Sequence, residues 1–123
     1  MRNLMIAASL IALCAVPAWA SDDIMAGYYG NTVVGTSAMG ESHTHYKADH
    51  TFDVTLSSMM GNRSTKGTWK IDEKDQLCRT YEQAPPGMPN PLCIPATAHK
   101  AGDSWTITFN GQTRDLTMKA GIQ

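Results

Sequence analysis

Hydrophobic and polar residues alternate along most of the chain, and this period of two predicts β-strands. Between positions 51 and 57, Phe52, Val54 and Leu56 are separated by single polar residues. Neighbouring residues of a strand point to opposite faces of a sheet, so such a segment has one buried and one solvated face. The pattern recurs between turn-forming segments rich in Gly, Asn and Asp, which favours an all-β antiparallel fold.

The segment 66–81 has the pattern of a β-hairpin, and the predicted sheet is organised around it. Trp69 and Ile71 fall on one face of its first strand, and a run of polar residues then supplies the turn. Leu77 and Tyr81 share a face of the returning strand. Strands before this hairpin can therefore place apolar residues against Trp69.

The pattern predicts about eight short strands separated by turns. Their expected ranges are 31–36, 41–48, 51–57, 66–71, 77–81, 92–99, 104–109 and 113–119. A single up-and-down β-barrel fits this spacing best, because closure removes exposed sheet edges, and a β-sandwich is the alternative. The expected inward residues are Val33 or Val34, Tyr46, Phe52, Val54, Leu56, Trp69, Ile71, Leu77, Tyr81, Leu92, Ile94, Trp105, Ile107, Phe109, Leu116 and Met118.

Three segments break the strand pattern. Residues 21–30 have apolar side chains at helical spacing and a terminal glycine, which predicts a short helix packed as a plug across one end of the sheet. Residues 58–63 are expected to form a loop. Residues 84–91 contain four prolines and cannot hold regular structure.

The first twenty residues have the pattern of a secretory signal peptide. Arg2 precedes an apolar run, and Ala18 and Ala20 occupy the positions that a signal peptidase reads. Cleavage between Ala20 and Ser21 would leave one β-domain, 21–123, in the periplasm or outside the cell. The apolar run is too short to span a membrane, and no later segment is apolar enough to do so.

Charge and cysteine content limit the functional classes. Without Arg2, nine of the 10 Lys and Arg residues remain against 11 Asp and Glu. No basic patch is evident, which argues against nucleic acid or an anionic membrane surface as the partner. Cys14 would be removed with the signal peptide, so Cys78 and Cys93 are expected to form one structural disulfide, worth roughly 3 kcal/mol.

Several short motifs carry a family resemblance. Gly30-Asn31-Thr32-Val33, a strand containing Tyr46, the segment Gly67 to Ile71 and Leu77-Cys78 together resemble a group of short exported proteobacterial proteins of unknown function. The resemblance covers 28–93 and implies a compact β-domain behind a signal peptide, with no catalytic residues to transfer. Gly67-Thr68-Trp69 is also similar to the G-x-W motif of lipocalin- and avidin-like barrels, although there the motif opens the first strand.

Histidine and methionine residues raise the possibility of a metal site. His43 and His45 are alternate residues of one predicted strand, and His50 follows it, so all three imidazoles could reach one copper or zinc ion. Four methionines in predicted loops add thioethers, which suit Cu(I). These are Met39, Met59, Met60 and Met88. The alternative is that the histidines are solvated side chains on the polar face of a strand.

Arg79 is the other unusual polar residue, because alternation places it on the inward face with Leu77 and Tyr81. A buried guanidinium needs a carboxylate or an anionic ligand, so Arg79 is a candidate ligand-binding residue. The alternative is an arginine at a strand end that extends to water.

The remaining pattern favours a binding protein over an enzyme. No nucleophile motif and no persuasive carboxylate pair is present, so no catalytic residue is expected. The sequence therefore predicts an exported, non-catalytic protein that binds an unidentified small ligand or envelope protein. The alternatives are a periplasmic copper or zinc protein and an inhibitor of a secreted or cell-wall enzyme that acts through the stiff proline-rich loop.

Overall fold

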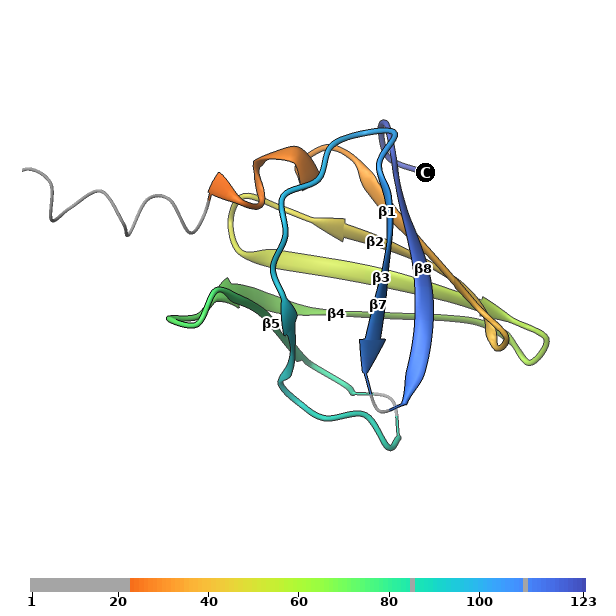
Figure 1. The fold of residues 1–123 in the computed structure, drawn as a ribbon. Helices are drawn as coiled ribbons and strands as arrows, with labels where there is room; N and C mark the ends of the chain where they lie inside the picture. The colour runs from red at the N-terminus through yellow and green to blue at the C-terminus, as the bar shows by residue number, and fades with distance from the viewer. Residues whose placement is uncertain (1–22, 85, 110) are drawn as a thin grey trace, which may run out of the picture.

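The computed structural model describes residues 23–84, 86–109 and 111–123, and the side chain of Phe109 lies outside the description. Its elements follow one another around the molecule in chain order (Figure 1). They are η1 (Ala26–Tyr28), β1 (Thr32–Ser37), β2 (Gly40–Tyr46), β3 (Thr51–Ser58), β4 (Gly61–Ile71), β5 (Gln76–Tyr81), β6 (Leu92–Pro95), β7 (Ser104–Phe109) and β8 (Gln112–Lys119).

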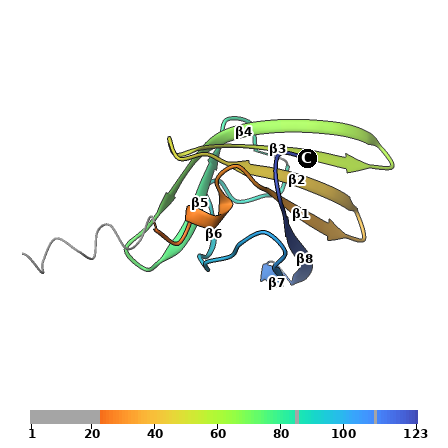
Figure 2. The same cartoon turned by 90° about the horizontal axis from the view of Figure 1, so that it is seen from above.

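The strands form one antiparallel sheet of eight that curls into a nearly closed up-and-down barrel (Figure 2). Their order is β6-β5-β4-β3-β2-β1-β8-β7, so β1 closes the sheet onto β8. The predicted barrel is confirmed, and the fold is that of a lipocalin-like barrel rather than a sandwich. Closure is incomplete, because β6 and β7 are the two edges of the sheet and do not pair with each other.

The core is built around Trp69, as the hairpin pattern predicted. Trp69 is almost fully buried, and its indole N–H donates a hydrogen bond to the carbonyl of Lys47 at 3.0 Å. Its ring packs edge-to-face against Tyr46 and stacks on the imidazole of His50, with ring centres 4.2 Å apart. These contacts tie the ends of β2 and β4 together beside the N-terminal segment.

One end of the barrel is closed by η1, which confirms the predicted plug. Tyr28 is buried between Tyr46 and Trp105, and its hydroxyl donates a 2.8 Å hydrogen bond to the carbonyl of Thr97. The expected continuous helix is wrong in extent, because Ile24 and Met25 lie in a turn before η1. Residues 21 and 22 lie outside the described residues.

Other boundaries also differ from the predicted ones. β4 begins at Gly61, inside the predicted loop 58–63, because its polar residues pair with β3 on a solvated part of the sheet. β6 ends at Pro95 rather than at 99, since proline has no N–H to continue the ladder. β2 ends at Tyr46, two residues before its predicted end.

Cys78 and Cys93 form the predicted disulfide. They face each other in the register of β5 and β6, with their Cα atoms 4.0 Å apart. The predicted signal peptide, 1–20, lies outside the described residues. No helix within the described ranges has the length and hydrophobicity that crossing a bilayer requires.

Candidate functional site

The interior of the barrel contains a small lumen, which is the candidate functional site. Its volume is about 60 Å³. Its wall is mainly apolar, with side chains from every strand. The lining residues are Val33, Ser42, Thr44, Tyr46, Val54, Leu56, Thr65, Arg79, Tyr81, Met88, Leu92, Ile94, Ile107, Arg114 and Leu116.

Arg79 extends from β5 into this lumen, on the inward face that strand alternation predicted. Its Nη1 donates a 3.0 Å hydrogen bond to the hydroxyl of Tyr46. The guanidinium carbon lies 5.4 Å from the ring centre of Phe52 and 5.2 Å from that of Tyr81, within the range of cation–π contacts. The side chain therefore lies inside the barrel among phenol and phenyl rings, with the residue half-buried as a whole and its Nε fully covered.

The hydrogen bonding of Arg79 is incomplete. Its Nε is buried and has no hydrogen-bond partner among the described residues. The described lining residues include neither Asp nor Glu, so no carboxylate of the lumen wall neutralises the guanidinium. A buried, charged donor without an acceptor is costly, which marks this position as one where a ligand oxygen would be stabilising.

The phenols around Arg79 respond to its charge. Burial raises the pKa of the Tyr81 hydroxyl, and the nearby guanidinium of Arg79 partly opposes this rise. Burial alone would lower the pKa of Arg79, but Tyr46 and Tyr81 outweigh it and keep the net shift upward. Arginine is not deprotonated in proteins near neutral pH, so Arg79 is a cation within the lumen.

A second arginine, Arg114 of β8, lines the same lumen nearer to the open end. It lies close enough to Tyr81 to lower the pKa of that phenol. Arg114 was not among the predicted site residues. The signal was present, because Arg114 alternates with the inward residues Leu116 and Met118.

A glycine of β1 lies beside the lumen wall. Gly35 faces Ser42 and Leu116, and a Cβ atom at this position would lie 2.7 Å from the Ser42 hydroxyl oxygen and 3.5 Å from Cδ of Arg114. A side chain at Gly35 would thus crowd Ser42 and Leu116, so the glycine lets β1 lie close to these lining residues of β2 and β8.

In the part of the chain that the structure describes, the ring nitrogens of His43, His45 and His50 do not gather into one group of potential metal ligands. Nε2 of His43 lies 2.7 Å from a carboxylate oxygen of Glu41, and Nδ1 of His45 lies 2.7 Å from one of Asp53. His50 instead stacks on Trp69. His45 and Lys47 outweigh the burial of Asp53 and lower the pKa of its carboxyl group. Copper or zinc binding through these histidines stays a prediction that this arrangement does not favour.

Within the described residues, one group of three potential metal ligands lies close together: Asp72, Cys78 and Cys93. Both sulfur atoms of this group are joined in the disulfide, so neither is free as a thiolate ligand. The group therefore offers a metal only the carboxylate of Asp72.

The proline-rich segment is attached to the barrel through the side chain of Asn90. The Asn90 side chain accepts a hydrogen bond from the backbone N–H of Tyr81 at 2.9 Å and donates one to its carbonyl at 3.1 Å. Met88 is half-buried and lines the lumen. Met88 therefore contributes to the lumen wall, while the other described residues between 86 and 91 are exposed, and inhibition through this segment stays a prediction.

Comparison with protein-family models, curated proteins and solved structures found no match for this chain, so the resemblance to exported proteobacterial proteins stays a prediction.

Proposed function

We propose that this is an exported, non-catalytic binding protein whose barrel lumen holds the acidic group of a small organic anion. The observation that carries the proposal is the guanidinium of Arg79, which lies inside a largely apolar lumen whose described wall contains no carboxylate. The lumen supplies the apolar surface and Arg79 supplies the specificity for charge.

A carboxylate fits this position better than a neutral group. Charge-assisted hydrogen bonds between arginine and a carboxylate are roughly twice as strong as neutral ones, and the planar guanidinium can make two of them in parallel. The hydroxyls of Ser42, Thr44 and Tyr46 add polar groups that can orient the ligand. The aliphatic remainder of the wall favours a hydrocarbon body on that ligand.

The chemistry of the wall supports binding over catalysis. The described lining residues include no histidine, cysteine or carboxylate that could act as a nucleophile or general base. The guanidinium stays protonated and so cannot exchange a proton with a substrate near neutral pH. The proposed role is therefore to sequester or carry the anion in the periplasm or outside the cell.

Isothermal titration calorimetry with matched acids and neutral analogues tests the proposal. Hexanoate and benzoate are compared with hexanol, hexanamide and benzyl alcohol on the purified protein. We expect the two acids to bind and the neutral analogues to bind at least about tenfold more weakly, because a hydrogen bond to a charged group is worth about 1.5–3 kcal/mol. Equal affinity for hexanoate and hexanamide would contradict the proposal without any mutation.

The substitution Arg79→Gln tests whether the preference for acids over neutral analogues depends on this residue. It should weaken hexanoate binding about 10- to 100-fold and leave hexanol unaffected. Lys70→Gln is the matched control, because Lys70 loses the same charge on an exposed position of the neighbouring strand β4. Hexanoate binding that Arg79→Gln leaves unchanged, in a variant with native circular dichroism, would overturn the assignment.

A further inference from the structure

A second hollow borders the lumen at the open end of the barrel. It lies between the β1–β2 turn and the β3–β4 turn, at the end opposite η1 (Figure 1). Its volume is about 320 Å³, several times the volume of the lumen itself. Leu56 and Arg114 line both spaces, so the hollow and the lumen are adjacent and share this part of their walls.

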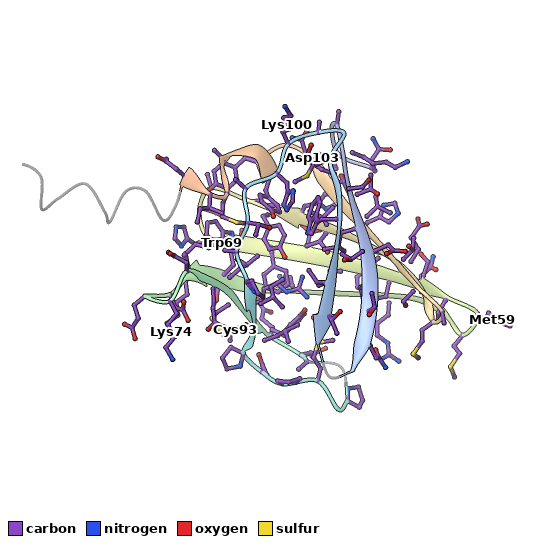
Figure 3. The ribbon with its side chains drawn as sticks, in the orientation of Figure 1. Met59, Trp69, Lys74, Cys93, Lys100 and Asp103 are labelled. Atoms are coloured by element: carbon purple, nitrogen blue, oxygen red, sulfur yellow. A yellow bond between two sulfur atoms is a disulfide. The ribbon has the colours of Figure 1, made fainter. Side chains whose placement is uncertain are left out.

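Exposed methionines border this hollow. In the described part of the chain, the exposed large hydrophobic residues are Met39, Met59, Met60 and Ile122, with relative exposures of 75%, 104%, 98% and 65%. The three methionines thus belong to the two turns at the open end, and Met59 stands at the outermost tip (Figure 3). Met39 and Met60 line the hollow, whereas Met59 does not.

The backbone beneath these side chains is closely packed. Gly40 has a φ of 144°, and a side chain on it would collide with the carbonyl oxygen of Ser57. The β1–β2 turn is therefore held against the end of β3, while the thioether side chains above it remain unpacked. A fixed frame with flexible, unbranched apolar side chains can adapt to hydrocarbon chains of different shapes.

We propose, as an extension of the proposed function, that the ligand is a long-chain amphiphilic acid whose tail leaves the lumen and lies across Met39 and Met60. The lumen, at about 60 Å³, is less than half the size of a cavity of about 150 Å³ that holds one benzene, so it admits a carboxylate and only the first few carbons of a chain. The remaining hydrocarbon of the proposed ligand passes by Leu56 and Arg114 into the larger hollow.

The charges at the hollow are compatible with this arrangement. Arg63 and Arg114 line it together with Glu41, whose carboxylate is engaged by His43. Two arginines at the exit attract an approaching acid, and their aliphatic stems offer further apolar surface to its tail. The side chains of Met39, Met60 and Leu56 then replace water around the hydrocarbon tail of the ligand.

The test is a chain-length series of carboxylates from butanoate to dodecanoate, each below its micelle-forming concentration. Burial of one methylene corresponds to about fourfold in affinity. We expect affinity to rise with length through and beyond octanoate, because carbons outside the lumen still find an apolar surface. An affinity that stops rising at hexanoate would overturn the inference.

The double substitution Met39→Ser/Met60→Ser tests whether these two methionines contact the hydrocarbon tail. It should weaken dodecanoate at least about tenfold and change hexanoate by no more than about twofold, whereas Met39→Leu/Met60→Leu should retain tight dodecanoate binding. Met59→Ser is the matched control, since Met59 is equally exposed but does not line the hollow. Dodecanoate binding that is unchanged in the serine double variant would overturn the inference.

The two proposals fail in different ways. Loss of the length effect, with short acids still bound through Arg79, contradicts the methionine surface alone. Absence of Arg79-dependent binding of short acids contradicts the proposed function itself.

Discussion

The phenol of Tyr28 shows how a single buried hydroxyl can couple the plug to the barrel. It belongs to η1, yet it donates to the carbonyl of Thr97 in the connection between β6 and β7. Burial, together with the nearby phenol of Tyr46, raises the pKa of Tyr28 well above its ordinary value, although the hydrogen bond to Thr97 opposes the shift. The neutral phenol is thus the form that the folded state favours.

Tyr28→Phe should therefore change stability in two ways. Near neutral pH it should lower the free energy of unfolding by about 1 kcal/mol, because the hydrogen bond to Thr97 is lost. In the native protein the stabilising effect of the raised pKa is complete below about pH 10 and is lost as the pH rises above that value, because the phenol ionises first in the unfolded chain. The variant should lose stability less steeply above pH 10.

Urea unfolding followed by tryptophan fluorescence at pH 7 and at several values above pH 9.5 measures both effects. An alkaline decline that is equally steep in Tyr28→Phe would show that Tyr28 is not the group responsible.

Individual site residues were predictable to the extent that strand alternation decides them. Alternation placed Arg79 inside and could equally have placed Arg114 there, since both follow the period of their strands. It could not show that the wall lacks a carboxylate, which depends on how all strands close around the lumen. Nor could alternation predict that His43 pairs with Glu41 and His45 with Asp53, because these pairings depend on side-chain rotamers and cross-strand register.

At the level of elements, β4 depends on a glycine at the point where three strands crowd together. Gly67 faces Phe52 on β3 and Tyr81 on β5. A Cβ atom at this position would collide with the carbonyl oxygen of Thr80 and lie 3.0 Å from the Phe52 ring. The glycine of the G-x-W segment is therefore required by the close packing of its neighbours.

Gly67→Ala should destabilise the barrel by about 1–3 kcal/mol or more, because the added methyl group must displace backbone atoms of β5. Ser64→Ala, on an exposed position of the same strand, should stay within about 0.5 kcal/mol of the native protein. Equilibrium urea unfolding of both variants makes the comparison. Equal stability of Gly67→Ala and Ser64→Ala would mean that β4 and β5 separate more easily than their contacts indicate.

Element boundaries were less predictable than element identities. The strands with clear alternation, β3 and β7, lie within a residue of their expected ranges. The start of β4 was missed because residues 61–66 are polar on both faces, and it is pairing with β3 that makes them a strand. The plug was predicted from its apolar spacing, but its short 3₁₀ form follows from tertiary contacts of Tyr28.

At the scale of the whole molecule, the disulfide lies at one open edge of the incompletely closed barrel. β6 is an edge strand of four residues that pairs with β5 alone. Leu92 and Ile94 of β6, with Met88 of the preceding segment, nevertheless form part of the lumen wall. The bond between Cys78 and Cys93 fixes this short edge in register with β5.

Reduction of the disulfide should therefore affect both stability and the lumen. The chain-entropy model gives a loss of roughly 3 kcal/mol for a closed loop of this length. The loosened edge should also weaken hexanoate binding under conditions in which the reduced protein is still folded. Urea unfolding and calorimetry with and without reductant provide the measurements, and Cys78→Ala/Cys93→Ala supplies the control that reductant must not alter. If the reduced protein kept its full stability and its affinity for hexanoate, pairing with β5 alone would be sufficient to hold β6, and the lumen wall would not depend on the disulfide.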